Sequence, residues 1–399
     1  MDWNAPKPPF EDTLIKCDCK AVRVSPDDGS QYFFGYFDKS PWNKAGVLLC
    51  QKATFSHRQP RFGDVSELGT LQDGKFTPFA STLAWCWQQG CMLQFFDEDT
   101  VIFNDFENDR FVSRLCDYRT GKILRTYDRP IYCLANDRSY ALSLDFARLD
   151  RERPGYGYTG VWHNNLLHAA PDNDGIWKID LKSGESTLLI SYRELRDKTS
   201  MCGVFDNVSW VNHLLCSPDD KRFGFLYRWR SITPTTYMNW QTVFYTCSAD
   251  GTDLYRLNDQ GMSSHYSWTD NEHIVCFINR MTAGWQHYLM TDKSPVEQPL
   301  SVGSFWGDGH CTFSTDKKWM LTDSYSWPAD FSRRIYLRDN ETGVVYLLGV
   351  FKSDPTLPGP CRCDLHPRLS RDNRTVCFDS VHEGRRGVYL IDVSEITCK

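Results

Sequence analysis

A repeated histidine–aspartate spacing constrains the fold of this chain more than any other feature. In three places a histidine precedes the aspartate of a polar turn by six residues, and in a fourth place by five. The pairs are His213 with Asp219, His265 with Asp270, His310 with Asp316, and His366 with Asp372. The turn aspartates follow one another at intervals of 51, 46 and 56 residues. Self-similarity on this scale is typical of arrays and propellers.

Each repeat also has the strand pattern of a propeller blade. Short stretches rich in Val, Ile, Phe, Tyr and Trp are separated by turn signals about every 8–12 residues, and four such stretches fill the repeat that contains His310. We therefore predict an all-β protein, a seven-bladed β-propeller of four-stranded antiparallel blades, folded as a single domain over residues 1–399.

The predicted blade boundaries follow from the repeat. A Pro-rich lead-in covers residues 1–16, and segment 14–24 could add a strand to the last blade and so close the ring. The seven blades are expected at about 17–79, 80–128, 129–197, 204–258, 262–300, 304–351 and 361–396.

Composition excludes several classes of function. The formal net charge is −6 and no basic block is present, so we expect no nucleic-acid partner. No run approaches the ~18 apolar residues of a membrane span, and the N-terminus lacks the pattern of a secretory signal. Most of the 16 cysteines fall inside predicted strands, as in proteins of a reducing compartment. We expect a cytoplasmic protein, with periplasmic or secreted placement left open, and make no prediction of oligomeric state.

The repeat also predicts where the histidines lie. Each stands at the start of the expected innermost strand of its blade, and inner strands line the central channel. Equivalent positions should therefore converge at one end of that channel. The alternative is that each imidazole is a structural hydrogen-bond partner tying one blade to the next.

A long insertion in the third blade carries a second group of candidate residues. Long loops in compact repeats are often functional. Aromatic and imidazole side chains here suggest a sugar-binding surface, with Tyr156, Tyr158, His163 and His168 as the binding residues. The alternative is a flap that covers the channel mouth.

Two arginines on one strand point to an anionic partner. Arg228 and Arg230 share a face because side chains alternate along a strand. Two adjacent guanidinium groups need an anion opposite, either a protein carboxylate or a carboxylate of the substrate.

Cysteine and histidine spacing in the last blade suggests a metal site. Cys361, Cys363 and His366, facing His310, form a plausible set of four ligands for a divalent metal. Thiolate and imidazole favour zinc, with manganese or calcium possible, and we expect the metal to be structural or charge-organising rather than hydrolytic.

Together these residues suit β-elimination from a uronic acid. Neutralising the substrate carboxylate with Arg228, Arg230 or a metal makes the C5 proton removable, and His213 or His265 could take it. A tyrosine could protonate the leaving oxygen, with Tyr156, Tyr158 and Tyr266 as candidates.

Four motifs are similar to those of the seven-bladed polysaccharide lyases. They are Asn212-His213 with Arg228-Trp229-Arg230, Ser264-His265-Tyr266-Ser267-Trp268, Gly309-His310 with Ser314-Thr315-Asp316, and His366-Pro367 with Ser370-Arg371-Asp372. In these motifs the chain resembles oligogalacturonate lyases and propeller ulvan lyases.

The resemblance to oligogalacturonate lyases implies a metal at His310 and His366, His265 as base and Arg228 or Arg230 as the neutralising arginine. Cys361 and Cys363 stand where that group has Gln and His, which implies a shift towards zinc. The ulvan-type resemblance implies roles for His168, His213 and Arg228.

Three functions are consistent with these observations. The first is a lyase acting on an acidic oligosaccharide that contains uronic acid. The second is a non-catalytic propeller that binds a glycan or a protein, because a propeller fold does not determine function. The third, a glycoside hydrolase, ranks last because no carboxylate pair stands out among Asp38, Asp105, Asp145 and Asp308.

Overall fold

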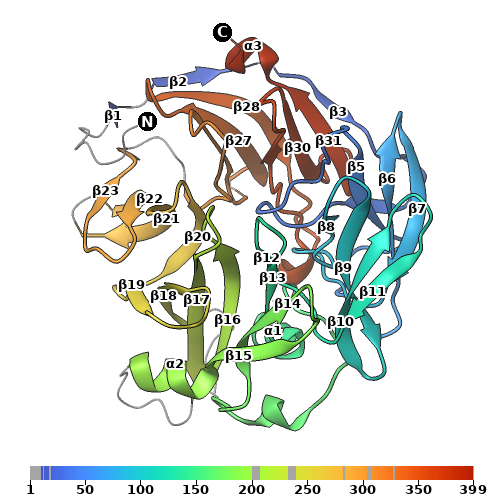
Figure 1. The fold of residues 1–399 in the computed structure, drawn as a ribbon. Coiled ribbons are helices and arrows are strands. Elements are labelled where there is room, and N and C mark those ends of the chain that lie inside the picture. The colour runs from blue at the N-terminus through green and yellow to red at the C-terminus, as the bar shows by residue number, and fades with distance from the viewer. Residues whose placement is uncertain are drawn as a thin grey trace.

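Seven antiparallel sheets surround a central axis in the computed structural model of this chain (Figure 1). The structure describes residues 10–11, 13–17, 19–199, 207–231, 240–281, 284–302, 307–326 and 329–398. The first nine residues of the predicted lead-in lie outside the described residues. The predicted all-β, seven-bladed fold is confirmed.

Each blade is a four-stranded sheet in which strands adjacent in sequence pair with one another. Blades one to three contain β4 (Gln31–Phe33), β5 (Leu48–Ala53), β6 (Ser66–Gln72) and β7 (Lys75–Thr82); β8 (Gln94–Phe95), β9 (Thr100–Glu107), β10 (Arg110–Asp117) and β11 (Ile123–Tyr127); and β12 (Cys133–Leu134), β13 (Tyr140–Ser143), β14 (Gly175–Asp180) and β15 (Ser186–Ser191).

Blades four to seven repeat this arrangement. They contain β16 (Asn207–Cys216), β17 (Arg222–Ser231), β18 (Gln241–Ser248) and β19 (Tyr255–Asn258); β20 (Ser263–Trp268), β21 (His273–Arg280), β22 (Gly284–Thr291) and β23 (Glu297–Pro299); β25 (Thr312–Phe313), β26 (Trp319–Asp323), β27 (Ser332–Asp339) and β28 (Val344–Lys352); and β29 (Arg368–Leu369), β30 (Thr375–Ser380) and β31 (Gly387–Asp392).

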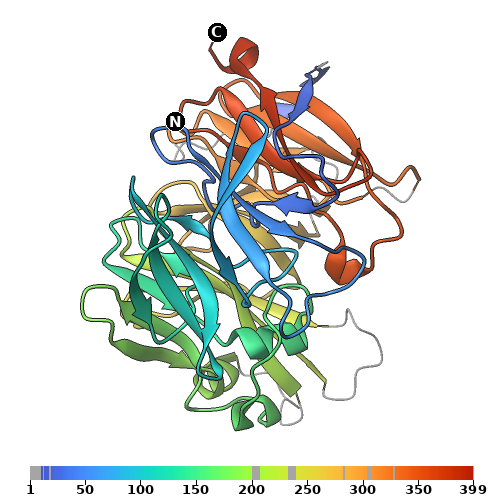
Figure 2. The same ribbon diagram turned by 90° about the vertical axis from the view of Figure 1, so that its right-hand side faces the viewer.

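The N-terminal segment closes the ring. β3 (Ala21–Arg23) pairs antiparallel with β31 and supplies the fourth strand of blade seven. β2 (Thr13–Lys16) instead adds a fifth strand to blade six, parallel to β28, and β1 (Phe10–Glu11) pairs with β24 (Ser301–Val302). Blue N-terminal strands therefore lie beside red C-terminal ones in both views (Figures 1 and 2). Joining the two ends of the chain in one sheet removes an open edge.

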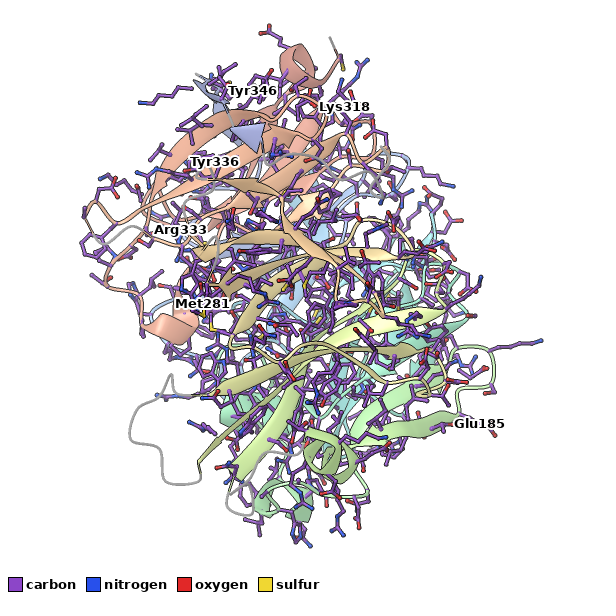
Figure 3. The ribbon with its side chains drawn as sticks, turned by 90° about the vertical axis from the view of Figure 1, so that its left-hand side faces the viewer. Glu185, Met281, Lys318, Arg333, Tyr336 and Tyr346 are labelled. Carbon is purple, nitrogen blue, oxygen red and sulfur yellow. The ribbon has the colours of Figure 1, made fainter. Side chains whose placement is uncertain are left out.

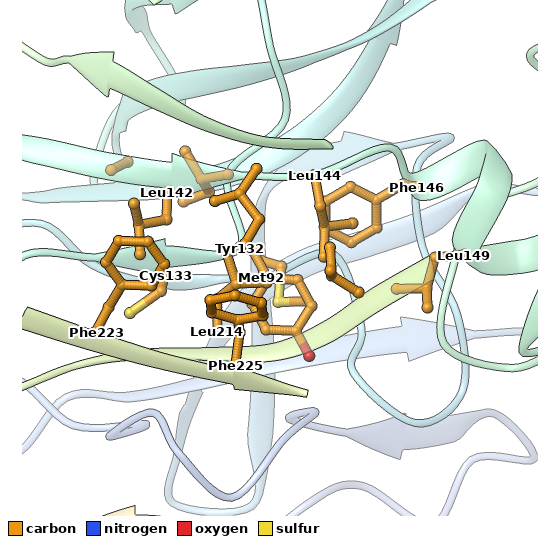
Figure 4. Packing of buried hydrophobic residues seen from close by; sticks show 14 of the residues in the cluster. Met92, Tyr132, Cys133, Leu142, Leu144, Phe146, Leu149, Leu214, Phe223 and Phe225 are labelled. Atoms are coloured by element: carbon orange, nitrogen blue, oxygen red, sulfur yellow. The ribbon is translucent and has the colours of Figure 1, made fainter. Parts of the chain in front are cut away.

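Buried aromatic and aliphatic side chains fill the spaces between blades. The largest cluster joins blades two, three and four, with Leu142 of β13 packed near Phe223 and Phe225 of β17 (Figure 4). Figure 3 labels Tyr336 of β27 and Tyr346 of β28, whose rings take part in the packing around blade six. This packing holds the inner strands, and the loops before them, in fixed positions around the axis.

The blade-three insertion is partly helical, which the sequence analysis did not predict. It contains α1 (Phe146–Glu152) and the 3₁₀ turn η1 (Asn164–Leu167). Asp145 caps α1 by accepting hydrogen bonds from the backbone N–H groups of Ala147 and Arg148. Phe146 and Leu149 anchor the helix in the main hydrophobic cluster (Figure 4).

The other helices within the described residues are short. They are α2 (Tyr192–Thr199), the 3₁₀ turn η3 (Gly359–Cys361) and α3 (Ser394–Thr397). Within the described part of the chain, no helix has the length and apolar character needed to cross a membrane.

Candidate functional site

The four repeat histidines stand where the inner-strand ladder is interrupted. His213 lies at a register shift in β16, and His265 lies at a register shift in β20. His310 and His366 come two residues before the short strands β25 and β29. The backbone of His213 has φ of 55° and that of His366 has φ of 43°, in the left-handed region that non-glycine residues seldom adopt. Bulges and left-handed residues often redirect side chains at functional sites.

These histidines converge around one aromatic ring, that of Tyr36. The Tyr36 centroid lies 5.5 Å from His213, 6.5 Å from His265, 5.7 Å from His310 and 4.9 Å from His366. Neighbouring imidazoles are also close: 4.0 Å separates His265 from His310, and 4.3 Å separates His310 from His366. We call these five residues the axial cluster. All five are buried, and His213, at 8%, is the most exposed.

Blade seven fixes the loop that carries Tyr36. The carboxylate of Asp379 accepts hydrogen bonds from the backbone N–H groups of Phe34 and Gly35. The guanidinium of Arg368 donates to the carbonyls of Gly35 and Tyr36 and also pairs with Asp379. Tyr36 is thus held at the axis by a buried polar network rather than by its own blade.

Tyr36 and His213 share a hydrogen bond. The phenol oxygen lies 3.1 Å from His213 Nδ1. Burial lowers the pKa of His213 well below its usual value, and the neighbouring Arg228 and His265 lower it further. Burial also raises the pKa of the Tyr36 phenol well above its usual value. A neutral imidazole therefore accepts the proton that a neutral phenol donates.

Asp308 orients His265. Its carboxylate lies 2.9 Å from His265 Nδ1 and also accepts a hydrogen bond from the hydroxyl of Ser264. Burial lowers the pKa of His265, and Asp308 offsets part of that effect. A carboxylate at Nδ1 assigns the proton to that nitrogen and leaves Nε2 as the basic atom.

Asp323, at the end of β26, orients His310 in the same way. Its Oδ1 lies 2.8 Å from His310 Nδ1 and also accepts a hydrogen bond from the His310 backbone N–H. Its Oδ2 accepts one from the His366 backbone N–H at 3.2 Å. Gly309 permits this approach, because a Cβ at that position would lie 1.9 Å from the Asp323 carbonyl oxygen.

A group of residues that could bind a metal ion combines two histidines of the axial cluster with a neighbouring carboxylate. His310, Asp364 and His366 each offer a ligand atom, and these atoms lie within 4.8 Å of one another. The Nε2 atoms of both histidines are buried and have no hydrogen-bond partner within the described structure. Unpartnered imidazole nitrogens beside a carboxylate fit a divalent cation.

Asp364 is held in its charged form by two arginines. Burial alone would raise the pKa of this carboxyl group, but Arg362 and Arg333 outweigh burial and hold the pKa well below its usual value. Arg333, which belongs to β27 (Figure 3), lies 2.7 Å from the carboxylate, and Arg362 lies 2.8 Å from it.

Cys361 and Cys363 are not part of this group among the described residues, contrary to the predicted four-ligand set. Cys361 packs in the hydrophobic cluster of blades one and two, and Cys363 is buried with its sulfur 3.8 Å from the Asp364 carbonyl oxygen. Burial raises the pKa of both thiols to about 11. The spacing of these residues matched a metal motif, but spacing does not determine which side chains turn towards the axis.

Arg228 and Arg230 have different partners. Arg230 pairs with Glu152 of α1 at 3.0 Å, so its anion is a protein carboxylate. Arg228 donates to the hydroxyl of Thr242 and the carbonyl of Ser263, and has no carboxylate partner in the described part of the chain. Burial, with the nearby Arg153, lowers the pKa of Arg228 to about 10. Of these two arginines, Arg228 is therefore the one whose positive charge could pair with the carboxylate of a ligand.

Of the four predicted sugar-binding residues, the structure brings Tyr156 to the axial cluster. Its ring lies 6.1 Å from His213 and 6.4 Å from Tyr36, and its phenol oxygen accepts a hydrogen bond from Arg362 at 2.9 Å. Tyr325 also lies beside the cluster: its ring is 5.8 Å from His310 and 5.6 Å from the Arg362 guanidinium.

The other three predicted sugar-binding residues lie elsewhere. Tyr158 is buried against Phe146, with ring centroids 4.3 Å apart and an interplanar angle of 1°. His163 pairs with Asp145 at 3.1 Å and lines a cavity of about 680 Å³ between blades two and three. His168 is exposed beside a smaller surface pocket. Tyr266, a candidate proton donor, donates a hydrogen bond to the His213 carbonyl from within the core.

The sequence analysis did not identify Tyr36, Tyr325, Asp323 and Asp364 as site residues. Tyr36 lies in a loop that the histidine repeat does not mark, so no repeat signal pointed to it. Asp364 directly follows Cys363 and lies two residues before His366, which was a usable signal, whereas Asp323 lies seven residues beyond Asp316, outside the noted motifs.

The fold and the axial cluster together define a seven-bladed propeller with a polar site on its axis. No protein-family model and no curated protein sequence matches the chain. Solved structures do match. An oligogalacturonate lyase in complex with manganese is 16% identical, with a TM-score of 0.68 over 96% of this chain and 95% of that one.

Two further structures agree on the fold. An oligogalacturonate lyase from Vibrio parahaemolyticus is 15% identical, with a TM-score of 0.64 over 97% of this chain and 96% of that one. The tricorn protease is 11% identical, with a TM-score of 0.52 over 94% of this chain but 34% of that one. The predicted resemblance to propeller lyases is therefore confirmed at the level of the fold.

Proposed function

We propose that this protein is a lyase that cleaves a uronic-acid-containing oligosaccharide by β-elimination. The observation that carries the proposal is the convergence of four imidazoles and a phenol near Arg228, which has no carboxylate partner among the described residues. The fold similarity to oligogalacturonate lyases supports an acidic oligosaccharide as substrate.

In this proposal Arg228 binds the carboxylate of the uronic acid. A carboxylate that is paired with a guanidinium withdraws electrons from C5 and makes the C5–H bond more acidic. Arg228 suits this role because Arg230 pairs with Glu152, and Arg333 and Arg362 share the carboxylate of Asp364, whereas Arg228 has no carboxylate partner among the described residues.

His265 is the proposed base. Asp308 holds its Nδ1–H, so Nε2 can accept the C5 proton and the Asp308 carboxylate can stabilise the imidazolium that forms. The C5–H electron pair becomes the C4–C5 double bond as the bond from C4 to the glycosidic oxygen breaks. Tyr36 is the proposed donor to that leaving oxygen, because its phenol remains protonated at the centre of the cluster.

A divalent cation is the proposed cofactor. His310, His366 and Asp364 would hold it, and their nitrogen and oxygen atoms suit manganese as well as zinc. When bound, the cation would supply positive charge for the substrate carboxylate next to Arg228. Metal analysis after purification tests this assignment: the proposal expects about one ion per chain, lost in His366→Ala and retained in Cys363→Ala.

The lyase itself is tested by incubation with a panel of acidic oligosaccharides, including galacturonate oligomers and ulvan fragments. The proposal expects ultraviolet absorbance from an unsaturated uronate with at least one acidic oligosaccharide and none with a neutral glycan. Arg228→Lys keeps a positive charge but loses the bidentate fork, so it should weaken the reaction without unfolding the protein.

A binding platform is the second candidate, and the burial of the axial cluster favours it. The four histidines are at most 8% exposed, and the cavity between Tyr36 and His213 is about 10 Å³. Calorimetric binding of an acidic oligosaccharide with no unsaturated product would identify a platform and reject the lyase.

A further inference from the structure

A pair of thiols lies between the inner strands of blades three and four. Cys133 of β12 and Cys216 of β16 have their sulfur atoms 3.7 Å apart. Both residues are 6% exposed. Figure 4 shows Cys133 beside Phe223 of β17, the residue that pairs with Cys216 in the sheet of blade four. The two positions are 83 residues apart in sequence, and no motif links them.

The pair is accessible from a cavity of about 180 Å³. Both cysteines line this cavity, together with Asn136, Arg138 and Lys39, whose ammonium pairs with the Asp38 carboxylate at 2.7 Å. The pair belongs to the largest hydrophobic cluster and also borders these polar and charged side chains. A small polar reagent could reach the sulfur atoms through this cavity.

The hydrogen bonds around the pair are asymmetric. The backbone N–H of Cys216 donates to Cys133 Sγ at 3.4 Å, and the Cys133 thiol lies 3.7 Å from Cys216 Sγ and donates to that sulfur. Tyr140 lies 3.6 Å from Cys216 Sγ, but its single proton goes to the Asp220 carbonyl at 2.8 Å. Among the described residues, Cys133 Sγ is thus the sulfur of the pair that accepts a hydrogen bond from a backbone N–H.

This asymmetry favours the thiolate on Cys133. The contacts with Cys216 and the charge of Lys39 lower the pKa of Cys133, and they outweigh the opposing effects of burial and of the Asp38 carboxylate. The thiolate is the form of cysteine that reacts with electrophiles. A neighbouring thiol in contact with it is the arrangement of a redox pair.

We propose that Cys133 and Cys216 form a redox-active thiol pair, which small peroxides entering the cavity beside Lys39 and Arg138 oxidise to a disulfide. The Cys133 thiolate attacks one peroxide oxygen, and the O–O bond breaks to give a sulfenic acid and hydroxide. The Cys216 thiol then attacks that sulfur, the S–S bond forms and water leaves. The peroxide is reduced by two electrons, and the two thiols supply them.

The product would link blade three to blade four through their inner strands. The sulfur atoms must approach from 3.7 Å to about 2.05 Å. Cys216 belongs to β16, the strand that also carries His213. The disulfide would therefore tie blade three to a strand that supplies one residue of the axial cluster.

Peptide mapping of the full-length protein tests the proposal. The reduced protein is treated with one equivalent of hydrogen peroxide, blocked with an alkylating reagent and digested without reductant. The expected result is a linked pair of peptides containing Cys133 and Cys216, which dithiothreitol separates.

Variants assign the two roles. Cys216→Ser should leave a sulfenic acid on Cys133 that a dimedone probe labels, and Cys133→Ser should abolish both the label and the linkage. Cys247→Ser changes a buried thiol of β18 in the same blade and should leave the linkage intact. If Cys133 and Cys216 of the wild-type protein both remain alkylatable in denaturant after peroxide, or if other cysteines are linked instead, the proposal is overturned.

Discussion

At the scale of single residues, the site depends on carboxylates that orient imidazoles. Asp308 contacts His265 Nδ1, and Asp323 contacts His310 Nδ1. The two histidines nevertheless have different expected roles, since His310 lies in the possible metal-binding group and His265 does not.

Replacing the proposed base should abolish most of the activity. His265→Ala removes the group that accepts the C5 proton, so the lyase rate should fall by about a hundred- to ten-thousandfold. Initial rates of ultraviolet absorbance measure this change. His273→Ala is the matched control, because His273 is also buried in blade five and paired with an aspartate, Asp270. Equal losses in both variants would show that His265 acts through folding alone.

A second prediction concerns stability at Asp150 in α1. Burial raises the pKa of this carboxyl group from 3.8 to about 6. Because the pKa of Asp150 is higher in the folded state than in the unfolded state, ionisation of this group destabilises the fold. The destabilisation is complete at pH values above about 6 and absent below 3.8. Asp150→Asn should therefore raise the free energy of unfolding by up to about 3 kcal/mol at pH 8 and change it little near pH 3.5.

Thermal unfolding at the two pH values measures the effect. The exposed Asp109→Asn should leave the unfolding midpoint unchanged at both. If Asp150→Asn were equally stabilising at both pH values, buried charge would not be the cause.

At the scale of secondary-structure elements, interruptions in the inner strands position the histidines. His213 and His265 lie at register shifts, and His310 and His366 precede strands of only two residues. In an uninterrupted strand, successive side chains would point to opposite faces of the sheet and so into the spaces between blades. The interruption directs them to the axis instead.

Gly309 tests this account of blade six. A methyl group at this position would meet the Asp323 backbone at 1.9 Å, so Gly309→Ala should destabilise the fold by about 1–3 kcal/mol and displace His310. Gly359→Ala is the control, because no atom lies within 4 Å of its Cβ position. Denaturant unfolding of both variants gives the comparison, and similar midpoints would contradict the proposed close approach.

At the scale of the whole molecule, the repeat predicted more than the individual motifs did. The repeated spacing of histidines and turns predicted the propeller, because each blade is a copy of the same four-stranded unit. The position of each histidine at its inner strand also predicted that the four imidazoles would lie close together. Tyr36 could not be predicted in this way, because it enters from blade one and is held by Arg368 and Asp379 of blade seven.

Side-chain direction limited the other predictions. Cys361 and Cys363 matched a metal-ligand spacing, whereas the structure brings Asp364 to the histidines instead. Tyr158 lay in a loop of sugar-binding composition, but its ring stacks on Phe146 in the core. In both cases the direction of the side chain depends on contacts with residues on other elements, which the spacing of residues in the sequence does not reveal.

The central claim is that the axial cluster performs an elimination, and mass spectrometry of the products from a galacturonate oligomer tests it most directly. Elimination adds no water, so the masses of the two products should sum to that of the substrate, with the unsaturated residue at the new non-reducing end. Products whose masses sum to the substrate plus one water would show hydrolysis and contradict the account.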